Sequence, residues 1–133
     1  MSTEDTERFE QQRSYFERAL ARLGEVLLVD ETEIVRDAII QRFEFTFEMA
    51  WKTLFRFLTG KGERVAEKAW AVLPEAFQGQ LIEDAETWDR MRELRNQTRH
   101  EYDQQKAIEV VAFVRQQAYP ALVRLRDEMA RRR

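Results

Sequence analysis

The chain has 133 residues, a length typical of one domain, and a formal net charge of −3. Its 44% hydrophobic and 35% charged residues, with only four glycines and two prolines, favour helices over a sheet protein rich in turns. The lack of cysteine excludes disulfides and thiolate metal ligands, and no apolar run approaches the ~20 residues of a membrane span. With an acidic, polar start unlike a signal peptide, we expect one cytoplasmic domain over residues 1–133 and no membrane contact.

Two long amphipathic helices are predicted first. One runs from about residue 5 to 29, and the next begins at a cap, Asp30 or Thr32, and ends at Gly60 and Gly62. Their expected inward stripes are Phe9, Phe16, Leu20, Leu23 and Leu27, then Val35, Ile39, Phe43, Phe47, Trp51, Leu54 and Leu58.

Three further helices are predicted in the second half of the chain. A shorter one covers 64–78 and is kinked or shortened by Pro74, while Asp84 and Asp103 begin the last two, the second of which bends at Pro120. Their expected inward residues are Val65, Ala69, Val72 and Phe77; Trp88, Met91, Leu94 and Thr98; and Ile108, Val111, Val114, Ala118, Leu122, Leu125 and Met129. The fold class is therefore all-α, an antiparallel four-helix bundle with one additional short helix.

The second helix is apolar on more than one face. Phe45, Met49, Phe55 and Phe57 point away from the stripe that faces the core. Because a bundle of one chain leaves such residues uncovered, they predict a homodimer surface.

Charge is unevenly distributed along the chain. Residues 1–89 carry 11 basic and 19 acidic side chains, whereas residues 90–133 carry 11 basic and 6 acidic ones. Such asymmetry is compatible with attraction of a polyanion to one side of the fold, but also with arginines that only improve solubility.

The sequence RNQTRHEY, residues 95–102, contains the one histidine of the chain. On an ideal helix Asn96 and His100 share a face, while Arg95 and Tyr102 share another, so the Arg95 and His100 side chains diverge by roughly 140°. They could meet if the helix loosens near residue 100, if the arginine bends inward, or if two copies face each other across a dimer axis.

Two interpretations of this segment stay open. It is either a polar helix end, where histidine and arginine interact well with the helix dipole, or a site of phosphodiester chemistry on RNA. In the second case His100 transfers protons, Arg95 and Arg99 neutralise charge on the phosphate oxygens, and Asn96 orients the imidazole or binds the substrate.

A metal or other cofactor is not expected. One histidine and no cysteine make a zinc site within one chain implausible, and Glu83, Asp84, Glu86 and Asp89 have the spacing of a solvated first helical turn rather than a magnesium site. Acid–base cleavage usually needs two proton-transfer groups, so a dimer would supply the second histidine.

RNQTRHEY resembles the R-x4-6-H motif of HEPN domains, and Tyr102 completes the longer R-x4-H-x-Y form. Residues 41–54, QRFEFTFEMAWKTL, are similar to the second helix of the branch called nucleotidyltransferase substrate-binding proteins. The resemblance spans about residues 8–130, nearly the whole chain.

The resemblance implies a HEPN-like bundle that dimerises around two motifs and has a minimal nucleotidyltransferase as partner. In toxin–antitoxin members the HEPN protein is a metal-independent ribonuclease, silenced when its partner transfers AMP to the motif tyrosine. Arg95 and His100 would then be catalytic, Asn96 supporting and Tyr102 the modification acceptor, while Arg99 lies at a variable position and would bind RNA phosphate through its charge.

Three functional hypotheses remain at this stage. The first is an endoribonuclease toxin, and the second is a non-catalytic subunit that presents a nucleotide or other substrate to a nucleotidyltransferase. The third is a scaffold in which the motif only stabilises the fold.

Overall fold

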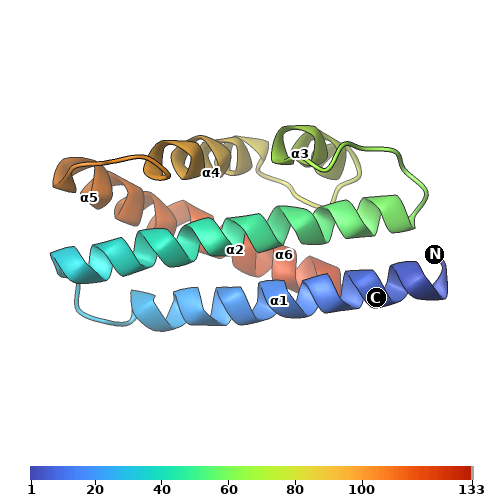
Figure 1. Cartoon of the computed structure of the whole chain (residues 1–133), viewed down its shortest axis with the longest axis horizontal. Coiled ribbons are helices and arrows are strands. Elements are labelled where there is room, and N and C mark those ends of the chain that lie inside the picture. The colour runs from blue at the N-terminus through green and yellow to red at the C-terminus, as the bar shows by residue number, and fades with distance from the viewer. Residues whose placement is uncertain (133) are drawn as a thin grey trace.

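The computed structural model describes residues 1–132, and within them it contains helices and no strand. The elements are α1 (Thr3–Leu27), α2 (Glu33–Gly60), α3 (Ala69–Gln78), α4 (Ala85–Thr98), α5 (Gln104–Phe113), a π-helical turn η1 (Val114–Ala118) and α6 (Tyr119–Arg131). Because α5, η1 and α6 are continuous, they form one long bent rod (Figure 1). The predicted bundle of four long helices and one short helix, α3, is confirmed. Arg133, the last arginine of the terminal run, lies outside the described residues.

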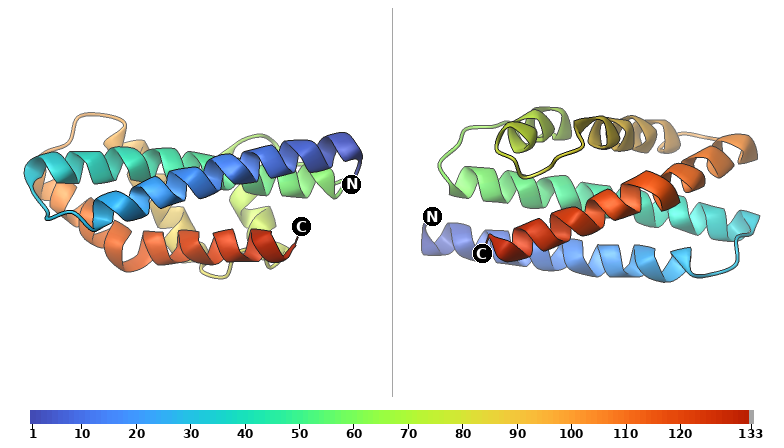
Figure 2. Two further views of the ribbon diagram at one scale, coloured as in Figure 1. Left: turned by 90° about the horizontal axis from the view of Figure 1, so that it is seen from below. Right: turned by 180° about the vertical axis from the view of Figure 1, so that it is seen from behind.

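The helix α2 is the centre of the bundle. Figure 1 shows α1 alongside α2 over most of its length, with α3 and α4 following each other along another side of α2. Seen from behind, the α5–α6 rod crosses diagonally over α1 and α2 (Figure 2). Every other α-helix therefore contacts α2, and side chains on different faces of α2 meet different neighbours.

Side-chain caps begin both long helices. The Ser2 hydroxyl accepts the backbone N–H of Asp5 at 3.1 Å, and the Thr32 hydroxyl accepts that of Val35 at the same distance. Thr32, the second of the two predicted caps, is thus the residue used. After α2 the chain turns at Gly62, whose φ of 90° is easily adopted only by glycine.

The core is continuous and rich in aromatic side chains. The largest fully buried ones are Trp88, Phe16, Phe43, Phe47, Leu20, Leu23, Ile39, Ile40, Leu54, Met91, Leu94 and Leu122. These positions confirm the predicted inward stripes of α1, α2 and α4. Phe57 was expected outside the core but is only 5% exposed, because it packs edge-on against Phe9 with 5.7 Å between ring centroids.

Part of the remaining apolar surface of α2 stays accessible in the single chain. Phe45 is 57% exposed, while Met49 and Phe55 are half-buried against the core. These three residues remain the predicted homodimer surface. Although α2 is apolar on much of its circumference, no helix within residues 1–132 is long and apolar enough to cross a bilayer.

The predicted helix over residues 64–78 begins five residues later, at Ala69. Of residues 64–68 only Val65 packs against the core, so a helix there would have no apolar face to bury. Phe77 was expected inward but is 46% exposed. Pro74 lies within α3, which is short at 10 residues.

The last rod bends as predicted, with a correction near its start. The Pro120 ring has no N–H for the carbonyl of residue 116, and the chain widens there into η1, where Tyr119 donates its N–H to the Val114 carbonyl. Ile108 was expected inward but is 44% exposed, because the α5 helix that Asp103 caps turns Ala107 into the core instead.

Phe47 is fully buried in the middle of α2 and packs against Trp88 of α4. Its truncation to alanine should lower the free energy of unfolding by about 3–5 kcal/mol, because it leaves a cavity beside the Trp88 ring. Urea unfolding followed by circular dichroism measures the change. The control is Ile34→Ala, on the same helix and 81% exposed, which should change stability by only about 0.5 kcal/mol. Equal losses in both variants would contradict the assignment of these two faces.

Candidate functional site

The segment RNQTRHEY spans the end of α4 and the turn into α5. Thr98 is the last residue of α4, Arg99 is its C-cap, and the backbone bends at His100. Asp103 then caps α5 by accepting the N–H of Lys106 at 2.8 Å. The helix therefore loosens at residue 100, one of the three arrangements that the sequence left open.

Arg95 points into the bundle and is only 8% exposed. Its Nη1 donates to Oε2 of Glu48 on α2 at 2.5 Å, and its guanidinium lies over the Phe47 ring, 5.5 Å from the centroid. The Glu48 carboxylate also accepts the indole N–H of Trp51 at 3.1 Å and pairs with Lys52 at 3.7 Å. One glutamate thus joins the α4 arginine to two side chains of the central helix.

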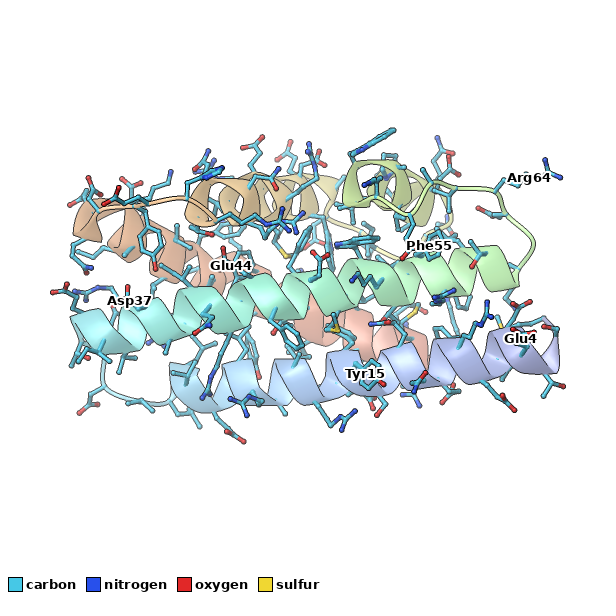
Figure 3. The ribbon with its side chains drawn as sticks, in the orientation of Figure 1. Glu4, Tyr15, Asp37, Glu44, Phe55 and Arg64 are labelled. Carbon is cyan, nitrogen blue, oxygen red and sulfur yellow. The ribbon has the colours of Figure 1, made fainter. Side chains whose placement is uncertain are left out.

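Two more side chains of the motif are bound by carboxylates of α2. The Thr98 hydroxyl donates to Glu44 at 2.7 Å, and the Tyr102 hydroxyl donates to Asp37 at 3.3 Å. Asp37, Glu44 and Glu48 are spaced seven and four residues apart, so they form one row along α2. Figure 3 shows Asp37 and Glu44 on the edge of α2 that faces α4 and α5. This row fixes the inner face of the motif.

These surroundings shift two pKa values. Burial, together with the nearby charge of Arg99, lowers the pKa of Arg95, and the Glu48 carboxylate opposes that shift. Burial raises the pKa of Tyr102 above its usual value, and Asp37 and Glu44 add to the rise by repelling a phenolate. At neutral pH Tyr102 is therefore a protonated hydrogen-bond donor, and Arg95 retains its charge.

Asn96 and His100 lie on the outside of the same segment, and both are exposed. Within the described chain the His100 imidazole has no hydrogen bond or ion pair, and Arg95 interacts with α2 instead. One subunit therefore does not join the arginine and the histidine of the motif. Their meeting depends on movement of Arg95 or on a second copy of the chain.

A polar groove lies where α2, α3 and α4 meet, beside the motif. It has a volume of about 420 Å³, and Arg95, Asn96 and Arg99 contribute to its lining. The other side chains that line it are Glu48, Trp51, Lys52, Glu67, Lys68, Ala69, Trp70 and Arg92. Five of the lining residues are cationic and two are acidic, so the motif opens onto a basic surface.

Sequence reasoning missed the contributions of Lys52, Lys68, Trp70 and Arg92 to this surface. A signal was present for Arg92, which shares one face of α4 with Asn96 and Arg99 at spacings of four and seven residues. Lys52 and Lys68 come from elements whose relative placement the sequence did not give.

The acidic residues that precede α4 are used differently. Asp84 occupies the predicted N-cap position without a side-chain cap bond, and its carboxylate pairs with Arg124 of α6. Among residues 1–132, no three histidine, aspartate or glutamate side chains are grouped as a metal site would require.

Residues 11–131 match the family model described as nucleotidyltransferase substrate binding protein like. The chain belongs to this family. It is the HEPN-like branch to which RNQTRHEY and residues 41–54 pointed, and that resemblance is confirmed. The match includes α2 and the whole motif, the two elements joined by the Arg95–Glu48 pair.

Two individual proteins are similar to this member of the substrate-binding family. It is 36% identical over 92 residues to a Haemophilus influenzae protein named "Probable ribonuclease HepT", a match that covers 63% of each chain. A solved crystal structure of a protein from Thermus thermophilus is 31% identical, with a TM-score of 0.70 over 88% of this chain and 97% of that one. The second match supports the helical fold.

Replacement of Glu48 by glutamine should destabilise this family member by about 1.5–3 kcal/mol, because the buried Arg95 guanidinium loses its charged acceptor. The free energy of unfolding in urea measures the loss. The control is Glu67→Gln, which removes an exposed carboxylate of the same groove that has no ion pair in the described structure and should cost about 0.5 kcal/mol at most. Equal stability of the two variants would show that Glu48 does not hold Arg95 in place.

Proposed function

We propose that this protein is a metal-independent endoribonuclease of a HEPN toxin–antitoxin pair, with His100, Arg95 and Asn96 as its catalytic residues. The observation that carries the proposal is the exposed, unpartnered His100 next to a basic groove that Arg95, Asn96 and Arg99 help to line. The name of the Haemophilus influenzae relative supports the same activity.

The chemistry follows from these groups. A neutral His100 takes the proton of a ribose 2′-hydroxyl, whose oxygen attacks the adjacent phosphorus, and an imidazolium protonates the leaving 5′-oxygen. The products are a 2′,3′-cyclic phosphate and a free 5′-hydroxyl. Arg95 and Arg99 stabilise the negative charge that grows on the phosphate oxygens, and Asn96 orients the imidazole or binds a substrate oxygen. No step requires a metal ion.

The mechanism requires a homodimer, because each chain has one histidine. Two subunits supply one imidazole as base and one as acid, with the exposed Phe45 and half-buried Met49 and Phe55 as the contact surface. The absence of cysteine supports a cytoplasmic location for such an enzyme.

Regulation by a minimal nucleotidyltransferase partner would act on Tyr102. Its hydroxyl already donates to Asp37, which is placed to take the proton as the phenol oxygen attacks the α-phosphate of ATP and pyrophosphate leaves. The attached AMP brings a negative phosphodiester and a nucleoside two residues from His100. Like charge and bulk then exclude RNA.

A second candidate is a non-catalytic subunit that presents a nucleotide to its nucleotidyltransferase. It is supported by the description of the matching family and by the Arg95–Glu48 pair, which neutralises the motif arginine in the single chain. This candidate predicts a stable complex with the enzyme and no RNA cleavage.

The purified protein should cut single-stranded RNA in the presence of EDTA, and His100→Ala should slow cleavage at least ~100-fold through loss of proton transfer. Gel analysis of a labelled RNA measures the rates. The control, Gln97→Ala, alters an exposed neighbour on α4 and should cut normally. Undiminished cleavage by the histidine variant would overturn the mechanism, and absence of cleavage by the unaltered protein would favour the non-catalytic subunit.

Co-expression with the partner nucleotidyltransferase should add AMP to Tyr102 and abolish cleavage. Peptide mass spectrometry should find the added mass on the peptide with Tyr102 but not on the one with Tyr15, a control tyrosine that is 40% exposed on α1. Tyr102→Phe should remain an active nuclease that the partner no longer silences. An unmodified Tyr102 in a silenced protein would contradict this form of regulation.

A further inference from the structure

The groove beside the motif contains an exposed tryptophan. Trp70, the second residue of α3, is 64% exposed, whereas Trp51 and Trp88 are 6% and 1% exposed. A tryptophan with most of its surface in water is uncommon, and no ring or cation contact is formed by Trp70 within residues 1–132. Its indole is therefore available to a ligand.

The cations around Trp70 are of two kinds. Lys52 and Arg95 both pair with Glu48, whereas Lys68, Arg92 and Arg99 have no ion pair or side-chain hydrogen bond in the described structure. Lys68 lies two residues before the tryptophan. Three unpaired cations thus share one groove with an exposed aromatic ring.

The unpaired cations are spread over two helices rather than gathered at one point. Arg92 and Arg99 are seven residues apart on one face of α4, roughly 10 Å along its axis, while Lys68 directly precedes the first residue of α3 and makes no cap hydrogen bond. Arg99 also directly precedes His100 in the chain. A ligand with several phosphates in a row would meet these charges in turn and pass next to the histidine.

We propose that this groove binds a stretch of single-stranded RNA, with one nucleobase stacked on the Trp70 indole and neighbouring phosphates on Lys68, Arg92 and Arg99. Aromatic stacking together with a basic groove is the usual way in which proteins hold single strands. The inference rests on the proposed function, because it names the surface that delivers RNA to His100.

Two other ligands have part of this chemistry. A mononucleotide such as ATP also has a base and phosphates, but it would leave the more distant cations unused. A partner protein could cover an exposed tryptophan, but three unpaired cations in the same groove favour a polyanion. Both serve as competing outcomes of the experiment.

The test measures binding of a fluorescein-labelled oligoadenylate of about ten nucleotides by fluorescence anisotropy. All proteins carry His100→Ala, so that no RNA is cut during the measurement. Trp70→Ala should weaken binding between about 5-fold and 100-fold, the range expected for loss of one stacked base. Trp70→Phe should restore most of the affinity, because a phenyl ring still stacks.

Two matched controls separate the site from general effects. Phe77→Ala removes another exposed aromatic of α3 that does not line the groove, and RNA affinity should be unchanged. Arg92→Ala should reduce the slope of log affinity against log salt by about 0.7, the value for one single-strand phosphate contact. Arg90→Ala, whose arginine pairs with Glu93 instead, should leave the slope unchanged.

The proposal is overturned if Trp70→Ala binds the oligoadenylate as tightly as its parent. It is also overturned if free ATP binds as tightly as the oligomer, or if the substitution weakens only the complex with the nucleotidyltransferase. Failure of the proposed function is a separate result. If the unaltered protein never cuts RNA but binds it in a Trp70-dependent manner, the proposed nuclease activity is wrong and the proposed binding site stands.

Discussion

The ion pair between Arg95 and Glu48 is the interaction on which the rest of the site depends. Arg95 is only 8% exposed, so its guanidinium would destabilise the fold if it were unpaired, because the hydration that it loses must be replaced. The acceptor comes from the central helix α2, which also binds Thr98 and Tyr102 through Glu44 and Asp37. The end of α4 is therefore held against α2 by polar contacts rather than by apolar packing alone.

The proposed function would give Arg95 a second role that opposes its structural one. As a structural residue Arg95 needs Glu48, but as a phosphate ligand it would have to share its donors with an incoming oxygen. Its guanidinium carries five N–H groups, of which Nη1 donates to Glu48 and the buried Nε is out of reach of a ligand, so an incoming phosphate oxygen would use the remaining N–H groups of Nη1 and Nη2. An incoming phosphate therefore need not break the contact with α2.

The motif has two faces with different tasks. Its inner face is bound to carboxylates, whereas Asn96, Arg99 and His100 face solvent beside a groove with an excess of positive charge. A fold that holds one half of a motif rigidly and leaves the other half without partners presents an incomplete site. Under the proposed function, a second subunit would complete this site by supplying the other histidine.

The sequence by itself determined the helical class, the inward stripes of α1, α2 and α4, and the family, because apolar periodicity and a local motif are both properties of neighbouring residues. It failed at the start of α3, which begins at Ala69 and not at residue 64, because few apolar residues precede it. It also failed in α5, where Ala107 rather than Ile108 faces the core. Only the tertiary structure decided that Arg95 meets Glu48, 47 residues earlier, and that Trp70 of α3 shares a groove with the face of α4. The physical reason is that such contacts depend on how whole helices pack against each other, and no local pattern encodes that packing.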